Sequence, residues 1–333
     1  MNIVRQLSSL RNLKQPVCLA AGFFDGVHLG HQEVLGKTIK AARRIGGEAW
    51  AMTFDPHPLK VLTPHAAPRL LTDTTHKLQL LEQFGLDGCL LIPFNRHFST
   101  LSAEEFLALL GHGIPTLHSL YMGHDWRFGH KGQGDFTLLR NWSSGKGISV
   151  HQVPSVLNKR RPISSTRIRN AIGKGDLDEA ASLLGRPFSV LGTVVTGQQI
   201  GRTLGFPTAN LAPRNEAAPP TGIYSVQAII GTKAYPGVVN FGHHPTISRI
   251  PKPILELHLL DTRMNLYHRK IEVFFLRRLR PEKKFATRPA LIRQINGDIE
   301  ATRTALASTA LKKLWIRTLQ RWHPESIVRQ TNK

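Results

Sequence analysis

Cysteines and long apolar runs are scarce in this chain of 333 residues. Its only cysteines are Cys18 and Cys89, and each lies in an apolar run typical of a β-strand. A disulfide framework is therefore excluded, and two buried thiols fit a reducing compartment. No apolar run approaches the roughly 18 residues that a membrane span needs, and residues 1–10 contain no apolar signal core. We therefore expect a cytoplasmic protein without a membrane span.

Acidic residues are also few. The 22 Asp and Glu stand against 44 Lys and Arg, which gives a net charge of +22 and an isoelectric point near 10.7. The excess is uneven, because residues 1–150 carry +4 and residues 151–333 carry +18. Such a charge favours anionic partners: nucleic acid, phosphate-rich ligands or acidic lipid. The net charge alone does not distinguish among these three kinds of partner.

The length fits two domains, and the first 150 residues alternate between strand and helix patterns. Strand-like runs at 16–21, 49–54 and 89–94 are separated by helical patterns that start at His31 and Thr75. This order predicts an α/β domain with a parallel, doubly wound, Rossmann-like sheet. Ligands of such sheets bind beyond the carboxyl ends of the strands.

From residue 188 onward the pattern changes to short β segments with glycine and proline turns, which predicts a barrel or sandwich. A helical pattern follows at 291–306, and the basic segment after it predicts either a helix docked on the barrel or an amphipathic arm for an acidic surface. We favour the docked helix. The predicted strands are 190–196, 223–230, 234–239, 255–259 and 271–276. The predicted domains are residues 1–186 and 187–308, followed by a basic extension, 309–333.

The segment from Gly22 to His31, Gly-Phe-Phe-Asp-Gly-Val-His-Leu-Gly-His, closes the first strand and opens the first helix. Gly26 and Gly30 permit a tight turn and a close approach of ligand to backbone. A helix N-terminus binds phosphate through its free N–H groups and dipole, and His28 and His31 share a face there. A lone histidine would more simply be a surface or capping residue, and a metal pair lacks a third ligand at recognisable spacing. The whole pattern indicates nucleotide binding.

A second segment, Ile163–Arg169 (Ile-Ser-Ser-Thr-Arg-Ile-Arg), contains hydroxyls and guanidinium groups that suit nucleotide phosphates. Taken alone, its Ser-Ser-Thr run also fits a helix N-cap. Together the two segments resemble the signatures of the HxGH nucleotidyltransferases and, more closely, those of the bacterial FAD synthetases. Residues 53–58 and 123–129 resemble further blocks of that family.

The resemblance implies transfer of AMP from ATP to FMN, which yields FAD and pyrophosphate. FMN brings an anionic phosphate, so no general base is required, and catalysis would rest on positioning and charge stabilisation with Mg²⁺. The implied catalytic residues are His28, His31 and Arg169, and Pro58 and Phe128 would lie near the flavin ring. The residues implied to bind ATP and its phosphates are Gly22, Phe24, Asp25, Gly26, Gly30, Asp125, Ser164, Ser165 and Thr166.

Three glycines four residues apart, Gly197, Gly201 and Gly205, follow a predicted strand and suit a loop around phosphates. Glycine spacing alone also fits a corner of a barrel, and no Gly-Lys-Ser/Thr makes this a Walker loop. The continuation Gly-Phe-Pro-Thr-Ala-Asn resembles the riboflavin kinase signature. That resemblance implies that Thr208 and Asn210 bind the Mg²⁺ of MgATP through neutral oxygens. The implied phosphate-binding residues are Gly197, Gly201, Arg202 and Gly205.

Leucines and polar residues alternate at 255–259, which places Glu256 and His258 on the strand face opposite the leucines. A solvated face is the usual meaning of such alternation. The resemblance to riboflavin kinases implies instead that Glu256 is the general base that accepts the proton of the riboflavin 5′-hydroxyl. It also implies that residues 187–308 form a riboflavin-kinase β-barrel with a terminal helix, and that Arg280 contacts the flavin.

The resemblances cover roughly residues 16–308 and predict a bifunctional enzyme that converts riboflavin to FMN and FMN to FAD. Thr262 replaces the usual Phe and His268 the usual Gly of the kinase pattern, and a histidine is strained there if φ is positive. An enzyme with only the FMN adenylyltransferase activity is therefore an alternative. The net charge leaves open a nucleic-acid-binding protein, although no Lys-Met-Ser-Lys-Ser-like block is present. We expect small-molecule substrates, no obligate nucleic acid, and a monomer or weak oligomer.

Overall fold

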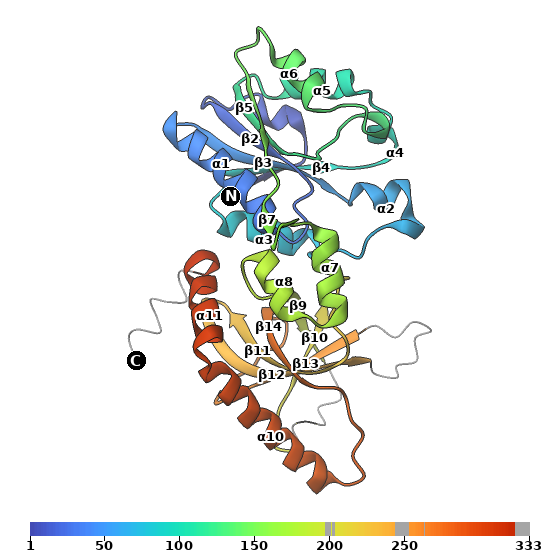
Figure 1. Cartoon of the computed structure of the whole chain (residues 1–333), viewed down its shortest axis with the longest axis vertical. Helices are drawn as coiled ribbons and strands as arrows, with labels where there is room; N and C mark the ends of the chain where they lie inside the picture. Colours follow the sequence, from blue (N-terminus) through green and yellow to red (C-terminus); the bar gives the residue numbers. More distant parts are fainter. Residues whose placement is uncertain (197–200, 202–203, 244–252, 263, 324–333) are drawn as a thin grey trace. The chain divides into compact units, whose positions relative to one another are not determined.

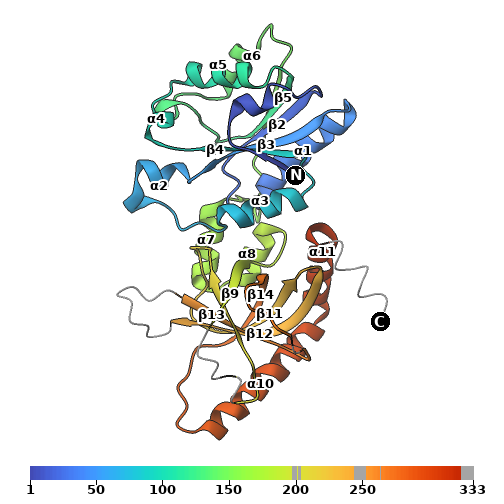
Figure 2. The ribbon, with the colours of Figure 1, turned by 180° about the vertical axis from the view of Figure 1, so that it is seen from behind.

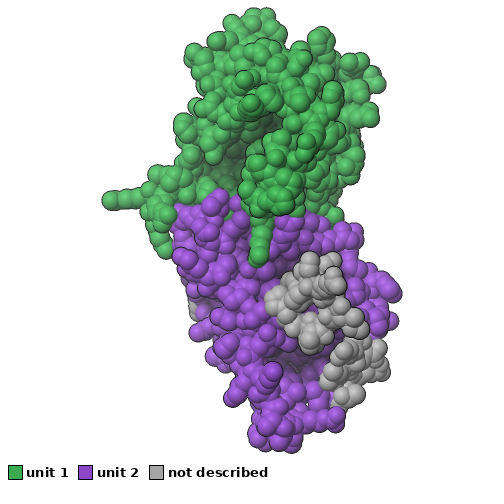
Figure 3. Space-filling model, turned by 90° about the vertical axis from the view of Figure 1, so that its right-hand side faces the viewer, with its two compact units in different colours: residues 1–70, 74–165 green, residues 71–73, 166–333 purple. Residues whose placement is uncertain are grey.

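The structure is a computed structural model that describes residues 1–196, 201, 204–243, 253–262 and 264–323. The chain divides into two compact units, residues 1–70 with 74–165 and residues 71–73 with 166–333 (Figure 3). Within the described residues, no helix is both long and apolar enough to cross a membrane.

A six-stranded sheet organises the first unit, in the order β1-β4-β3-β2-β5-β6, and every neighbouring pair is parallel. The parallel pairing follows from the alternation of strands with helices, because a parallel pair needs a long crossover connection. The predicted α/β fold of this half is confirmed. The strands are β1 (Asn2–Val4), β2 (Val17–Ala21), β3 (Glu48–Asp55), β4 (Gly88–Pro93), β5 (Leu117–Gly123) and β6 (Ser149–Val153).

The direction of strand addition reverses beside β2, because β3 and β4 follow on one side and β5 and β6 on the other. Right-handed crossovers then place α1 (Leu29–Arg44) and α3 (Thr74–Gln83) on one face of the sheet, and α5 (Ala103–Gly113) and α6 (Phe136–Ser143) on the other (Figure 1). A ligand site is expected beyond the carboxyl ends of β2 and β5, where the order reverses. The shorter helices are α2 (Pro58–Leu62) and α4 (Arg96–Ser99).

Apolar side chains from both faces of the sheet form the core of this unit. All five residues of β2 are buried, and α1 buries Val34, Leu35 and Ala42 at the spacing that predicted the helix. On the opposite face, Phe106 and Leu110 of α5 pack in the core with the sheet. The helix pattern and the burial therefore agree on which side of each element faces inward.

The second unit contains a closed six-stranded antiparallel barrel, in the order β10-β13-β12-β11-β14-β9. The β-barrel that the resemblance to riboflavin kinases implies is therefore confirmed, and the sandwich is excluded. The hairpin β7 (Leu157–Asn158) and β8 (Arg161–Pro162), then α7 (Ser165–Lys174) and α8 (Leu177–Leu184), precede it in the chain. The barrel strands are β9 (Ser189–Val195), β10 (Ala209–Pro213), β11 (Gly222–Ile230), β12 (Lys233–His243), β13 (Pro253–Leu259) and β14 (Lys270–Arg280).

Two C-terminal helices, α10 (Arg288–Ala307) and α11 (Thr309–Trp322), lie along the outside of the barrel (Figure 2). The apolar side of α11 packs on β14, where the rings of Trp315 and Phe274 are 5.2 Å apart and Leu319 joins the same cluster. Trp322 is 1% exposed, and its ring lies 4.8 Å from the buried guanidinium of Arg186. The described part of the extension is therefore a docked helix, as the sequence predicted.

Candidate functional site

The loop that follows β2 is sharply bent. Phe24, Gly26 and Val27 have positive φ angles of 52°, 77° and 40°. Of these residues, only Gly26 adopts such a conformation without steric cost, so the loop holds strain of the kind that clusters at ligand sites. The bend brings the chain to His28, which is the N-cap of α1.

His28 and His31 lie together at the first turn of α1. The backbone N–H of His31 donates to Nδ1 of His28 at 3.3 Å, and the two rings stack with centroids 3.6 Å apart. Because Nδ1 accepts, a neutral His28 carries its proton on Nε2, which is then a donor. Gly30 leaves room for this stack, since a Cβ there would lie 3.1 Å from the His28 ring and the ring would have to shift slightly.

The charge state of His31 is set by its surroundings. Burial, then the neighbouring His28 and Lys77, hold the pKa of His31 well below its usual range. Its Nδ1 is buried and has no hydrogen-bond partner among the described residues. A phosphate close to this ring would favour the charged imidazolium and reverse the balance, so the pair is suited to an anionic ligand.

The second signature, Ile163–Arg169, lies against the first, Gly22–His31, at two points. The hydroxyl of Ser165 donates to the carbonyl of Asp25 at 3.1 Å. The carbonyl oxygen of Ile163 lies 3.8 Å from where a Cβ on Gly30 would stand. Residues far apart in the sequence thus form one site in the first unit.

Three further residues of this signature differ in their surroundings. Ser164 and Thr166 are exposed. Arg169 is half-buried on α7, in the second unit, and its part in the site stays a prediction.

The remaining residues predicted for this site lie after β3 and β5. Asp125 is exposed in the turn directly after β5, the strand that pairs with β2. Pro58 is buried at the start of α2. Phe128 is 6% exposed and belongs to an aromatic core, where it stacks on Trp126 with centroids 5.0 Å apart. The flavin contacts of Pro58 and Phe128 stay predictions.

In the barrel, strand register brings the predicted kinase residues to one level. Asn210 of β10 pairs with Glu256 of β13, and Glu256 pairs with Asn240 of β12. Directly paired residues of antiparallel strands share a face, so these three side chains form a polar row: Asn210, Glu256 and Asn240. The same level continues through Ile223 of β11 to Arg280 of β14.

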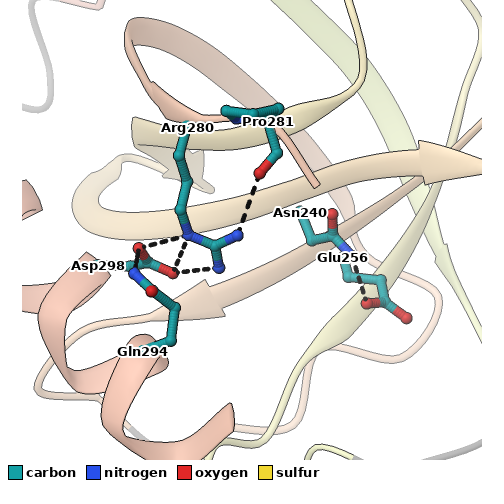
Figure 4. A network of polar contacts seen from close by, with 6 residues as sticks. All are labelled: Asn240, Glu256, Arg280, Pro281, Gln294 and Asp298. Atoms are coloured by element: carbon teal, nitrogen blue, oxygen red, sulfur yellow. Dashed lines mark hydrogen bonds and ion pairs between the residues drawn. The ribbon is translucent and has the colours of Figure 1, made fainter. Parts of the chain in front are cut away.

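Glu256 stands in the middle of the polar row and is half-buried. The amide nitrogen of Asn240 donates to its Oε2 at 3.4 Å (Figure 4). Leu255 and Leu257, its neighbours along β13, are buried on the opposite face, as their alternation predicted. The carboxylate therefore belongs to a partly shielded polar surface rather than to a fully solvated one.

The Gly-Phe-Pro-Thr-Ala-Asn signature is fixed beside this row. Nδ1 of His258 lies 2.9 Å from the carbonyl oxygen of Pro207, which can accept its proton. His258, on the polar face of β13, therefore holds the loop that precedes β10.

Two glycines of this loop, Gly201 and Gly205, suit the backbone that the structure describes. A Cβ on Gly201 would lie 2.4 Å from the carbonyl oxygen of Phe206, so only glycine fits there. Gly205 has a φ of 87°, in the region that favours glycine. Gly197 and Arg202, also predicted to bind phosphate, lie outside the described residues.

A cavity of about 650 Å³ opens at the signature. Its lining includes Gly205, Thr208, Asn210, Thr262 and Tyr267. Among the described residues, no group of three His, Cys, Asp or Glu side chains could hold a metal. The hydroxyl of Thr208 and the amide oxygen of Asn210 fit Mg²⁺ all the same, because this ion takes oxygen ligands and completes its shell with water and substrate phosphates.

Arg280 is held by a buried ion pair. Its Nη2 lies 2.7 Å and its Nε 2.9 Å from the carboxylate of Asp298 on α10, and Nη1 donates to the carbonyl of Pro281 at 3.1 Å (Figure 4). Gln294 donates to the same carboxylate at 3.0 Å. The guanidinium therefore joins α10 to the end of β14, and the predicted flavin contact of Arg280 stays a prediction.

Comparison with known proteins covers both halves of the chain. A family model described as FAD synthetase matches residues 10–167, and one described as riboflavin kinase matches residues 184–306. The bifunctional riboflavin kinase/FMN adenylyltransferase of Pseudomonas fluorescens is 37% identical over 93% of this chain and 99% of its own. This chain belongs to the bifunctional riboflavin kinase/FMN adenylyltransferase family. The member from Escherichia coli (strain K12) is 37% identical over 90% of this chain and 96% of its own.

A solved structure supports the arrangement within each unit of this family member. A protein of Streptococcus pneumoniae, described as a macrolide-efflux protein, has a TM-score of 0.78 at 30% identity. The match covers 90% of this chain and 98% of the other. The family predicted from the two signatures is thus confirmed.

The kinase half of this family member has the strained turn that the sequence suggested. His268 has a φ of 64°, in the region that favours glycine. Leu266 and Tyr267, just before it, line the cavity. The replacement of glycine by histidine therefore stores strain in a turn at the edge of the candidate kinase site.

Sequence reasoning does not single out three residues that the structure connects to the sites: Lys77, Asn240 and Asp298. Lys77 has a detectable signal, because it lies one helical turn from Leu80 and Leu81 on the buried side of α3. Asn240 and Asp298 give no such signal. Their significance depends on strand register and on how α10 packs, which the sequence pattern does not contain.

Proposed function

We propose that this chain phosphorylates riboflavin to FMN in its barrel and transfers AMP from ATP to FMN in its parallel-sheet unit. The observation that carries the proposal is the polar row, in which Asn210, Glu256 and Asn240 lie side by side at one level of the barrel. The stacked pair His28 and His31 supports the second activity. Membership of the family supports both.

In the kinase step, Glu256 accepts the proton of the riboflavin 5′-hydroxyl as that oxygen attacks the γ-phosphorus of ATP. The bond from phosphorus to the β-phosphate oxygen breaks, and ADP leaves. Asn240 orients the carboxylate through its amide N–H. Mg²⁺ at Thr208 and Asn210 would neutralise phosphate charge, and Arg280 would contact the flavin.

In the adenylyl transfer, an oxygen of the FMN phosphate attacks the α-phosphorus of ATP, and pyrophosphate leaves. The nucleophile is already an anion, so proton removal is not needed. His28 donates from Nε2 to a phosphate oxygen, and His31 gains a proton as negative charge approaches. Arg169 adds positive charge. Asp125 and the hydroxyls of Ser164, Ser165 and Thr166 bind ATP, and Pro58 and Phe128 bound the flavin.

The proposal includes the organisation of the chain. The adenylyltransferase domain spans residues 1–186, the kinase barrel residues 187–308 and the basic extension residues 309–333. The two family matches, at 10–167 and 184–306, support these limits. We also propose a cytoplasmic enzyme that is a monomer or weak oligomer, and both cysteines are buried free thiols, which supports a reducing compartment. Size-exclusion chromatography with light scattering tests the oligomeric state.

The direct test incubates the pure chain with Mg²⁺, ATP and either riboflavin or FMN, and separates the flavins by chromatography. Riboflavin should become FMN and then FAD, and removal of Mg²⁺ with EDTA should stop both steps. Conversion of FMN alone would limit the function to adenylyl transfer. If neither flavin reacts, the proposal is wrong.

A further inference from the structure

A buried lysine lies beneath the loop that follows β2. Lys77 belongs to α3 and is 8% exposed. Its Nζ donates to the hydroxyl oxygen of Thr53 at 3.1 Å, to the carbonyl of Phe54 at 3.2 Å and to the carbonyl of Phe23 at 3.4 Å. The hydroxyl of Thr53 donates to the same Phe23 carbonyl at 3.0 Å. Lys77 thus ties the ends of β2 and β3 together at the bent loop.

All three of these hydrogen-bond partners of Lys77 are neutral oxygens. Among the described residues no carboxylate forms an ion pair with it, although Asp25 and Asp55 act on it from a longer distance. Burial lowers the pKa of Lys77, and the Cys89 thiol, followed by these two carboxylates, opposes that shift. An ammonium group buried without an adjacent counter-charge leaves positive potential in its surroundings.

That potential reaches the histidine pair. After burial, two neighbouring titratable groups, His28 and then Lys77, disfavour the protonated form of His31. The positive potential that adds to the effect of burial on His31 also attracts a polyphosphate to the loop. Lys77 does not need to touch the phosphates for this, because charge interactions in a partly buried site extend over several ångströms.

We propose that Lys77 is a positioning residue for adenylyl transfer: its ammonium group fixes the Phe23 carbonyl of the bent loop and supplies positive potential that draws the triphosphate to His28 and His31. This inference rests on the proposed function of the first unit. A purely structural role, in which Lys77 only holds α3 to the sheet, is the alternative.

The experiment compares Lys77→Met, which removes the charge and keeps the length, with Lys77→Arg, which keeps the charge. We expect Lys77→Met to lower kcat/KM for the conversion of FMN to FAD by about 10- to 100-fold. Lys77→Arg should recover part of that loss. Phosphorylation of riboflavin by the same chain should stay unchanged, and it serves as an internal control for concentration and for the second unit.

A matched variant separates charge from stability. Leu80→Ala removes a fully buried side chain from the same helix without changing any charge. We expect it to lower the melting temperature yet leave kcat/KM for FMN unchanged at temperatures where the unit is folded. If Leu80→Ala and Lys77→Met reduce FMN conversion equally at equal loss of melting temperature, Lys77 has only a structural role.

A second readout does not need activity. The pKa of His31 can be followed by NMR, with its ring signal assigned by its loss in His31→Gln. Lys77→Met should raise the pKa of His31 only in part, because burial, the larger cause of the low pKa, remains, whereas Lys77→Arg should leave the pKa as low as in the wild-type chain. An unchanged pKa in Lys77→Met would overturn the electrostatic part of the inference. If the wild-type chain makes no FAD, the proposed function fails, but this measurement still decides the effect of Lys77 on His31.

Discussion

The two candidate sites use opposite chemistry. In the first unit, two imidazoles and a buried ammonium surround a loop at a helix N-terminus, and the described site offers cations and N–H donors. In the barrel, one carboxylate lies between two amides. The difference follows from the attacking groups. A flavin phosphate is already an anion and needs its charge stabilised, whereas a flavin alcohol must lose a proton.

We expect the strongest loss of activity when the candidate general base of the barrel is removed. Glu256→Gln keeps the size of the side chain but cannot accept a proton, so riboflavin phosphorylation should fall by about 10²- to 10⁴-fold. Conversion of FMN to FAD should be unaffected. The measurement is the initial rate of each step in the purified variant. Equal losses in both steps would indicate a folding defect instead of a missing base.

The complementary substitution acts on the histidine pair. His28→Ala removes the donor and the N-cap, so FMN adenylylation should fall by about 10²- to 10³-fold, while riboflavin phosphorylation persists. His28→Asn is the matched control, because asparagine still caps the helix. The initial rate of FAD formation should stay low in both variants. A full recovery of activity in His28→Asn would reduce the role of His28 to capping.

An intermediate effect is expected from the ion pair of Arg280. Asp298→Asn leaves the guanidinium without its charged partner and should destabilise the second unit by about 3 kcal/mol, measured by chemical denaturation. It should also raise the KM for riboflavin more than it lowers kcat, since Arg280 is expected at the flavin. Arg303, which pairs with Asp261 on the exposed surface, gives the control: Arg303→Ala should change the stability far less than Asp298→Asn does. Equal losses in the two variants would count against a stabilising buried pair.

The pH dependence of stability tests the low pKa of His31 in the first unit. The pKa of His31 is lower in the folded chain than in the unfolded one, so the unfolded state binds more protons at acid pH. Its contribution to stability is fully present above the unfolded pKa, about 6.5, and is lost as the pH falls below it. His31→Gln should flatten this part of the pH profile, measured by chemical denaturation. An unchanged profile would contradict the low pKa.

The smallest effect concerns the turn at His268. His268→Gly relieves a positive φ but adds freedom to the unfolded chain, so stability should rise by about 1 kcal/mol or less. Any gain in riboflavin phosphorylation would appear in KM, because the turn borders the cavity. Thermal unfolding and kinase kinetics measure the two consequences. A loss of stability would mean that His268 makes contacts that outweigh the strain.

Much of the fold can be read from residue patterns, and the gaps have physical causes. The helix α1 is long and periodic, and the strands β2 to β4 are continuous apolar runs, so their sequences define them. The patterns do not reveal β5, because His118 and Ser119 interrupt its apolar run, or β10, because Leu211 is its only large apolar residue. Both strands exist because their neighbours pair with them.

The sites show the same limit. The spacing of His28 and His31 predicts that they share a face, and alternation predicts the polar face for Glu256. No local pattern contains the register that places Asn240 beside Glu256. Nor does any local pattern contain the contact between Ser165 and Asp25, which are 140 residues apart. Local periodicity therefore gives the direction of a side chain, while its partners depend on tertiary structure.

The register of the barrel has a consequence for how this half of the chain can vary. If β13 gained or lost a single residue, each side chain beyond that point would change sides, so that Glu256 would exchange faces with the leucines. The insertion would destroy the core and the candidate catalytic carboxylate together. Changes of length are therefore tolerated in the connections between strands but not within β13. We therefore expect related chains to differ in the lengths of their loops and to keep the spacing along this strand.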